Sequence, residues 1–278
     1  MKKWFKIIGR ILGGLFVLLL ILSLIFNQMV FRLMFGLGYM DVYNGNNERG
    51  NQLMQYAMSQ MDSIDGQTYH SLSVQNTKNG NYHLAIDALN KAYEMDPSEV
   101  GAYFGWVLLY YYHDYERALE VLEKYDALTP EFSDAPMGED IHYLKGLAHM
   151  QMENWILAKE EIEYYIKESS ETVGEKYVDV YAFVQLGRCY AQMEEWNQAI
   201  ILYRQAIQNY EECSEAYYYM GLAQIELKEG DKACYSLNTA DSLIQSGYKS
   251  SDTYIEYFHE IYPQQIQIAL QTNCDTTE

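Results

Sequence analysis

Residues 180–210 read "VYAFVQLGRCYAQMEEWNQAIILYRQAIQNY", two stretches with helical apolar periodicity on either side of the polar turn "MEEWN". Three small residues recur 34 positions later: Gly187, Ala199 and Ala206 are followed by Gly221, Ala233 and Ala240. A fixed offset of this size is typical of arrays of small helical units. This repeat therefore decides the fold.

The same alanine position can be followed toward the amino terminus. Ala158, Ala118 and Ala85 precede Ala199 at successive spacings of 41, 40 and 33 residues. The two longer spacings are explained by polar inserts at 130–140 and 169–176. We therefore predict five units, beginning near Gly66, Glu99, Glu139, Val180 and Ser214.

Each unit contains two amphipathic stretches joined by a short polar turn, such as "KNGNY" or "KEGDK". Antiparallel helices approach closely only where side chains are small, which explains the glycine of the first stretch and the alanines of the second. Pro97 and Pro130 are predicted to end second helices, because proline cannot donate the amide that continues a helix. These patterns predict an all-α chain.

The units resemble the tetratricopeptide repeat (TPR) family. The family pattern aromatic-x2-Leu-Gly-x2-Tyr, followed by an alanine and a second aromatic, is met by Phe183, Leu186, Gly187, Tyr190, Ala199 and Tyr203. The first unit matches through Tyr69, Leu72, Ala85, Leu89, Ala92 and Pro97. It departs from the pattern at Ser73 and Asn76. The resemblance covers 66–247 and implies a right-handed α-solenoid with a concave inner face.

The sequence around the repeats predicts four regions. These are a basic start and anchor (1–32), a stalk with a short helix (33–65), the repeats (66–247), and a capping helix with a disordered tail (248–278). The stalk contains "YNGNNERGN", and its helix is expected from Gln52 to Asp62. The capping helix is expected over 250–270, starting near Ser251 or Asp252.

The amino terminus has the pattern of a membrane anchor. Four cations precede Ile11–Phe26, which carries no charge, and the apolar stretch extends to about 20 residues, enough to cross a bilayer. The basic cluster predicts a cytoplasmic amino terminus and an extracytoplasmic (periplasmic) repeat domain. No second apolar stretch of this length follows in the sequence, which predicts a single-pass protein. A cleaved signal peptide, which would release a secreted binder, is the open alternative.

Charge and cysteine content limit the partners and cofactors. Residues 50–278 carry 13 basic and 37 acidic side chains, a balance that excludes nucleic acid as a partner. The four cysteines include no Cys-x-x-Cys pair, which argues against structural zinc. A disulfide among Cys189, Cys213 and Cys234 is expected only in an oxidising compartment, and otherwise these cysteines are packing residues or free thiols.

No catalytic motif was found, and we expect neither enzymatic activity nor a cofactor or metal. His142 and His149 lie seven residues apart, but a third ligand is missing. They are therefore interpreted as packing residues.

The remaining functional pattern is a stripe of large residues on the first helices of the units. In the TPR family this face lines a groove that binds peptides, and tyrosine suits such a groove because it joins a large apolar ring to a polar tip. The predicted groove residues are His70, Tyr103, Val107, Tyr110, Tyr111, Tyr143, Leu147, Met150, Tyr181, Arg188, Tyr218 and Leu222. The alternative interpretation of such stripes is core between helices.

These patterns predict a membrane-anchored scaffold or adaptor that binds a protein or peptide partner in its groove, with a role in envelope secretion, assembly or chaperoning. Chaperone-binding members of the family grip a terminal carboxylate with several cations on these first helices. Here Arg188 is the single cation among the predicted groove residues, so a carboxylate clamp is not supported. The alternative function is a structural subunit of an envelope complex that self-associates as a homo-oligomer.

Overall fold

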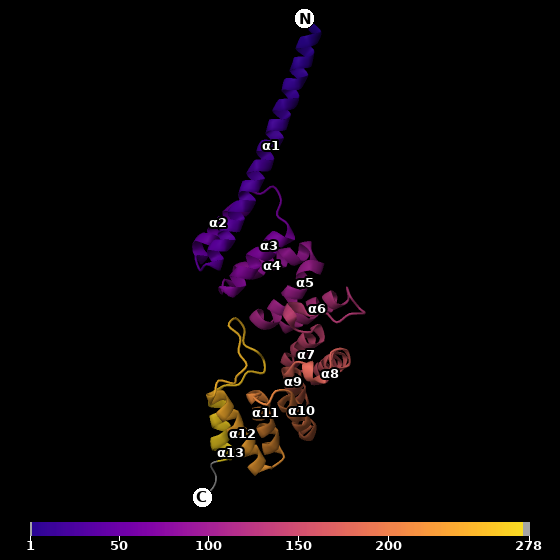
Figure 1. Ribbon diagram of the computed structural model, residues 1–278, viewed down its shortest axis with the longest axis vertical. Helices are drawn as coiled ribbons and strands as arrows, with labels where there is room; N and C mark the ends of the chain where they lie inside the picture. The colour runs from indigo at the N-terminus through magenta and orange to yellow at the C-terminus, as the bar shows by residue number, and fades with distance from the viewer. Residues whose placement is uncertain (1, 275–278) are drawn as a thin grey trace. The chain divides into compact units, whose positions relative to one another are not determined.

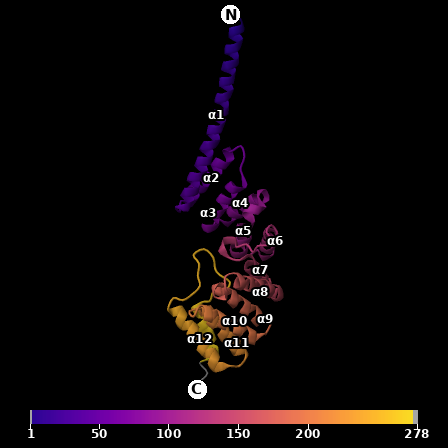
Figure 2. The same cartoon turned by 45° about the vertical axis from the view of Figure 1, so that its right-hand side comes forward.

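The computed structural model describes residues 2–274, with the backbone alone described at 2–12, 16, 19–21, 24 and 25. Every regular element in the described range is a helix (Figures 1 and 2). The chain divides into two compact units, Met1–Val100 and Gly101–Glu278.

The first unit consists of two helix pairs: α1 (Lys2–Tyr43) with α2 (Asn47–Gln60), and α3 (Gly66–Lys78) with α4 (Tyr82–Met95). The α1–α2 pair crosses at two glycines. A Cβ on Gly38 would lie 2.7 Å from the Gly50 carbonyl oxygen, and one on Gly50 would lie 2.6 Å from the Gly38 oxygen. The turn between them contains Gly45 at φ +87°, a conformation that favours glycine.

This pair replaces the flexible stalk expected over 33–65. The helix that begins in the apolar amino-terminal stretch continues to Tyr43, and its carboxyl-terminal part packs on α2 through Val42 and Met54. The core of the unit is completed by Met58, Leu72 and Ala88. Between α2 and α3, Asn51 and Asn76 exchange two side-chain hydrogen bonds of 2.8 and 2.9 Å, which explains why asparagine replaces the expected tyrosine at position 76.

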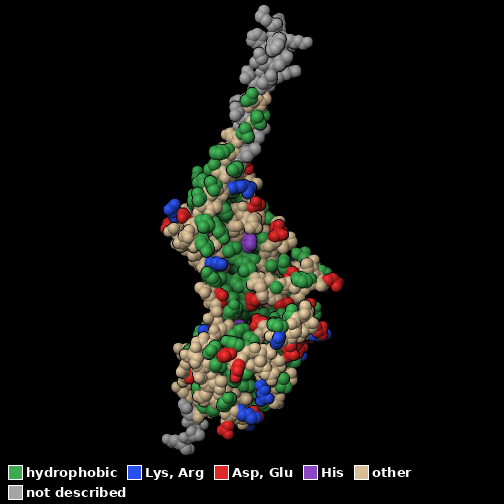
Figure 3. All heavy atoms as spheres, viewed as in Figure 1, with side chains coloured by type: hydrophobic (Ala, Val, Ile, Leu, Met, Phe, Trp, Pro, Cys, Tyr) green, Lys and Arg blue, Asp and Glu red, His purple; other side chains and the backbone are tan. Residues whose placement is uncertain are grey.

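The predicted membrane anchor is wrong by the test of the structure. In the part of the chain that the structure describes, no helix is long and apolar enough to span a membrane. The apolar residues from Ile11 to Phe26 form one segment of a 42-residue helix that also contains polar and charged residues. Hydrophobic side chains cover much of the described surface of α1 (Figure 3). The predictions of a single-pass topology and of an extracytoplasmic location depended on this anchor and are wrong for the same reason.

The second unit contains the remaining helices. In chain order they are α5 (Pro97–Val107), which starts in the first unit, a π-helical turn η1 (Leu108–Tyr112), α6 (Tyr115–Asp126), the 3₁₀ turn η2 (Pro136–Gly138), α7 (Ile141–Gln151), α8 (Trp155–Thr172), the 3₁₀ turn η3 (Glu175–Tyr177), α9 (Val180–Gln192), α10 (Trp196–Asn209), α11 (Ser214–Glu226), α12 (Gly230–Gln245) and α13 (Pro263–Asn273). With α3–α4, these helices form the five predicted pairs. Pro97 begins α5, where its missing amide costs nothing.

The pairs share one packing register. In the last four pairs the glycine of the first helix meets a large side chain of the second: Gly146 faces Ile162, and Gly221 faces Leu237, at 2.5 and 2.8 Å from an added Cβ. Each turn also contains one residue with positive φ, five positions before the alanine of the second helix. These residues are Gly80, His113, Glu153, Glu194 and Lys228.

The α5–α6 pair has one extra residue. Gly105 lies 13 residues before Ala118, whereas Gly146 lies 12 before Ala158. The π-helical turn η1 absorbs this extra residue, because a π turn spans five residues where an α turn spans four. Gly105 therefore still packs against Leu122, 2.6 Å from an added Cβ.

The carboxyl-terminal region differs from the prediction. Residues 248–262 form no regular helix, and the capping helix α13 begins at Pro263. Gln265 accepts the Tyr262 amide at 2.8 Å and so fixes this start. Of the predicted disordered tail, residues 271–273 belong to α13, and 275–278 lie outside the described residues.

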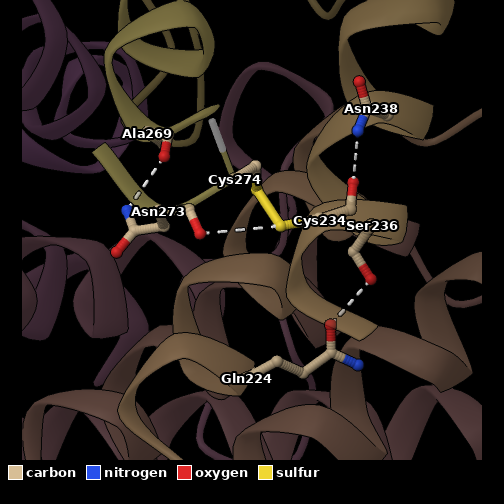
Figure 4. Close-up of a disulfide and its surroundings, with 7 residues drawn as sticks. All are labelled: Gln224, Cys234, Ser236, Asn238, Ala269, Asn273 and Cys274. Carbon is tan, nitrogen blue, oxygen red and sulfur yellow. Dashed lines mark hydrogen bonds between the residues drawn. A yellow bond between two sulfur atoms is a disulfide. The ribbon is translucent and has the colours of Figure 1, made fainter. Parts of the chain in front are cut away.

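A disulfide holds α13 to α12, but its pairing differs from the prediction. Cys234 is bonded to Cys274 (Figure 4). Cys189 and Cys213 are buried free thiols. Beneath the disulfide, Leu237 of α12 and Ile266 of α13 are fully buried in one cluster with Ile261.

Candidate partner-binding face

The 248–262 segment lies against the first helices of the second unit. It leaves α12 at Gly247, whose φ of +90° permits the sharp exit, and returns at α13. Both ribbon views show it running from the α12–α13 pair toward the α5–α7 part of the unit (Figures 1 and 2). We call the inner face the surface of η1, α9 and α11 that it contacts, together with Trp106 of α5 and Glu139, which lie beside Tyr110.

At the α5 end of the inner face, aromatic rings make the contact. Phe258 stacks on Tyr110 with centroids 5.3 Å apart and planes at 18°, and Tyr257 meets the same ring edge-on at 6.2 Å. The Tyr110 hydroxyl donates to Glu139 Oε1 at 2.8 Å, and Trp106 Nε1 donates to Oε2 at 2.7 Å. Burial raises the pKa of Glu139, because water has little access to its carboxyl group. The hydrogen bonds from Trp106 and Tyr110 act in the opposite direction.

In the middle of the inner face, α9 binds the segment through Tyr181 and Arg188. The imidazole of His259 stacks on the Tyr181 ring at 3.8 Å. Arg188 Nη1 donates to the main-chain oxygen of Phe258 and, at 2.7 Å, to Gln185 Oε1. Burial, with a smaller effect of the Arg188 charge, lowers the pKa of His259 to about 3, so the imidazole is neutral near pH 7.

At the α11 end, a buried carboxylate receives the segment. Glu215 is 1% exposed, and its Oε1 accepts the main-chain amide of Ser250 at 2.8 Å. Ser250 Oγ in turn lies 2.8 Å from His259 Nε2. Burial raises the pKa of Glu215. The inner face therefore holds a non-helical loop through stacked rings, one carbonyl and one amide.

The predicted groove residues separate into three groups. Tyr110, Tyr181 and Arg188 contact the 248–262 segment directly. Val107, Tyr143, Leu147 and Met150 are buried core residues, 3% exposed or less, as the alternative interpretation of the stripe expected. The others lie elsewhere: Tyr218 and Leu222 pack against the α12–α13 cluster, Tyr103 and Tyr111 are half-buried on α5 and η1, and His70 is half-buried on α3 of the first unit.

Several residues of this contact were not predicted. They are Trp106, Glu139 and Glu215 on the inner face, and Tyr257, Phe258 and His259 on the segment. Glu139 and Glu215 could have been recognised from the sequence, because each stands near the start of a repeat unit, next to the stripe. The run of three rings, "YFH", could also have been recognised, because a polar capping helix has no reason to carry it.

The two histidines of α7 are accounted for by packing and ion pairing. His142 Nδ1 lies 2.6 Å from Glu161 Oε2, which Lys145 Nζ also approaches at 3.3 Å. His149 is buried, and burial lowers its pKa. Within residues 2–274, no three His, Cys, Asp or Glu side chains are placed to hold a metal ion.

Comparison with models of known protein families gives matches in two of the five repeats. The family model described as tetratricopeptide repeat matches residues 66–99 and, in a second version, 181–212. No curated protein matches the chain by sequence.

Solved structures share the fold at low sequence identity. MamA from Desulfovibrio magneticus is 20% identical with a TM-score of 0.55, over 66% of this chain and 97% of that one. PilF of Pseudomonas aeruginosa is 17% identical with a TM-score of 0.55, over 87% and 98%. The Cut9–Hcn1 hetero-tetramer of the APC/C is 12% identical with a TM-score of 0.56, over 87% of this chain and 42% of that one. With its five helix pairs in one register and two units that match the family model, this chain belongs to the tetratricopeptide repeat family.

Proposed function

We propose that the chain is a non-catalytic scaffold that binds a protein partner by holding a non-helical stretch of it on the inner face. One observation carries this proposal: the face already holds a non-helical loop, residues 248–262, through ring, carbonyl and amide contacts. A surface that binds main-chain groups and rings of one stretch can bind another of the same chemistry.

Among the predicted groove residues, support is strongest for Tyr110, Tyr181 and Arg188, since these three make the observed contacts. Support for a protein partner also comes from the Cut9–Hcn1 structure, a hetero-tetramer with this fold. The buried acids Glu139 and Glu215 favour a partner stretch with donors and rings over one with acidic side chains.

The test is affinity capture with the tagged full chain and two variants. Arg188→Met keeps an unbranched apolar stem but removes the guanidinium donor. Tyr235→Ala is the control, because it alters a residue of α12 that is 71% exposed. We expect a partner that both the wild type and Tyr235→Ala capture and that Arg188→Met loses. The same set of proteins from all three would contradict the proposal.

A second candidate function is self-association through α1. Its described apolar side chains are spaced by three and four residues and are more than half exposed; they include Leu15, Leu18, Leu22, Phe26, Met29 and Leu33. An apolar stripe of this spacing is typical of helices that pair with other helices. Sedimentation velocity of the full chain over a hundredfold range of concentration tests it, and a constant monomer would exclude it.

A further inference from the structure

The contact between the 248–262 segment and the inner face involves the same groups that an outside partner would use. Phe258 covers the Tyr110 ring, and its carbonyl accepts from the Arg188 guanidinium. Ser250 donates its amide to Glu215. While the segment is seated, these three sites are all occupied.

We propose that the 248–262 segment is an intramolecular ligand that closes the inner face, and that the partner is a non-helical stretch with adjacent aromatic or imidazole rings, which binds by displacing it. The proposal rests on the proposed function and names the chemistry of the partner. The displaced part is 248–260, because Ile261 is fully buried in the α12–α13 cluster and stays with α13.

The segment has the properties of a displaceable element. It contains no regular helix, and several of its main-chain amides are held by side chains, as at Ser250 and at Tyr257, which donates to Glu260 at 3.0 Å. Residues 251–254 are exposed. Segments that have few regular backbone hydrogen bonds and are partly exposed open at a lower free-energy cost than packed helices.

The fixed groups of the face define what the partner offers. Arg188 is held in place by Gln185 and by the Tyr219 ring, whose centroid lies 5.0 Å from the guanidinium carbon. A guanidinium held in this way presents donors to a main-chain carbonyl. Glu215 needs a donor, and burial raises its pKa, so an incoming carboxylate is disfavoured there. The partner is therefore a ring-bearing stretch that offers a carbonyl to Arg188 and an amide, not a carboxylate, to Glu215.

A resident ligand weakens the apparent affinity for an outside ligand in proportion to the fraction of molecules in which the face is open. Both ends of the segment are anchored, at α12 and at α13, so its effective concentration at the face is on the order of millimolar. Loosening the segment without touching the face should therefore increase the affinity for an outside copy of it.

The probe is a fluorescent peptide with the sequence of residues 249–262, KSSDTYIEYFHEIY, titrated into the full chain and read by anisotropy. In the Phe258→Ala variant, loss of the stacked ring loosens the segment, and we expect the peptide to bind about tenfold more tightly than to the wild type. Thr253→Ala, at an exposed position of the same segment, should match the wild type. Adding Arg188→Met to Phe258→Ala should reverse the gain.

Equal peptide affinity in the wild type, Phe258→Ala and Thr253→Ala would overturn the inference, provided that all three show the same helix content and unfolding midpoint. If Phe258→Ala loses helix content, Phe258→Leu, which removes the stacked ring but keeps a branched apolar side chain, replaces it. The two proposals can fail separately. Partner capture that depends on Arg188 without a change in peptide affinity rejects only the displaced ligand, and a tenfold gain without any captured partner rejects only the scaffold.

Discussion

The imidazole of His259 lies parallel to the ring of Tyr181, with centroids 3.8 Å apart and planes 9° apart. One ring belongs to an irregular segment near the carboxyl terminus and the other to the first turn of α9, 78 positions earlier in the sequence. A contact over this separation fixes the segment on the inner face, which makes it the starting point for tests of the account.

The stability of the protein should depend on the titration of His259. Its pKa is about 3 in the folded protein, against an ordinary value near 6.5, because it is buried and lies near Arg188. The unfolded chain therefore binds more protons between these values, and stability falls as the pH falls through this window. We expect the free energy of unfolding of the wild type, relative to His259→Phe, to drop by up to about 1.4 kcal/mol per pH unit from pH 6 to 4.

The comparison with His259→Phe is needed because other groups titrate with the opposite sign. Burial raises the pKa values of Glu139, Asp179 and Glu215, so their contributions to stability are lost as the pH rises through the raised values. These contributions cancel in the difference between the two proteins. Urea unfolding at several pH values measures it, and parallel pH profiles would show that His259 is hydrated in the folded state.

Removal of the Glu139 carboxylate should destabilise the inner face. Glu139→Ala leaves the Trp106 indole and the Tyr110 hydroxyl without their acceptor, at a cost of about 2–4 kcal/mol in the free energy of unfolding. Glu139→Gln keeps one acceptor oxygen and should cost about half as much. Urea unfolding followed by tryptophan fluorescence measures both. Equal stability of Glu139→Ala and wild type would mean that water replaces the carboxylate.

The close crossing of α9 and α10 should not tolerate a methyl group. A Cβ on Gly187 would overlap the Tyr203 ring, so Gly187→Ala should lower the free energy of unfolding by about 1–3 kcal/mol. Gly230→Ala is the matched control, because nothing lies within 4 Å of its added Cβ, and it should be neutral or stabilising by up to about 1 kcal/mol. Thermal unfolding followed by circular dichroism separates the two, and an equal effect of both substitutions would argue against the crossing.

Breaking the disulfide should destabilise the end of the second unit. Cys234 and Cys274 close a loop of 40 residues, and Cys274→Ser should cost about 3–4 kcal/mol by releasing that constraint from the unfolded chain. A reducing agent should lower the unfolding midpoint of the wild type and leave that of Cys274→Ser unchanged. If the reductant affects both equally, the stabilisation has another source.

Thiol reactivity should distinguish the four cysteines. Burial raises the pKa of both Cys189 and Cys213 to about 12, so neither forms a reactive thiolate near pH 8. Alkylation of the native protein should label no cysteine before reduction, and Cys234 and Cys274 after it. Mass spectrometry of the peptides counts the labels. Rapid labelling of Cys213 in the native state would show that the start of α11 is open.

The repeats could be predicted from sequence because their signal is local and recurs. The 34-residue offset and the alanine positions place helices on a common register, and three units begin at the expected residues, Gly66, Val180 and Ser214. The extra residue at Gly105 was harder to interpret, since a π-helical turn changes the spacing of a stripe without changing its composition.

The α1–α2 pair was missed although its register matches the others. Gly38 lies 12 residues before Gly50, and Gly45 stands five before it, as in the repeat units. Both helix-crossing positions are glycine here, and the turn residues "YNGNN" dominate the composition, so the stretch has the appearance of a stalk. The apolar stretch before it was interpreted as an anchor for the same reason: the prediction used the apolar composition and not the helix-pair spacing that follows it.

The inner face could be predicted only in part. Tyr110, Tyr181 and Arg188 follow from the stripe on the first helices, but the stripe does not distinguish residues that face a partner from those that face the next helix. The contact from Phe258 and His259 depends on a long return of the chain. Such a contact leaves no periodic trace in the sequence.

Hydrogen exchange at the Ser250 amide tests the central claim most directly, namely that the inner face holds a non-helical peptide stretch. That amide donates to the buried Glu215, at 2.8 Å, only while the segment is seated. We predict exchange at least about tenfold slower than in the free 249–262 peptide, and faster exchange in Arg188→Met, since an opened segment exchanges as an unstructured chain does. Exchange in the wild type at the rate of the free peptide would contradict the account.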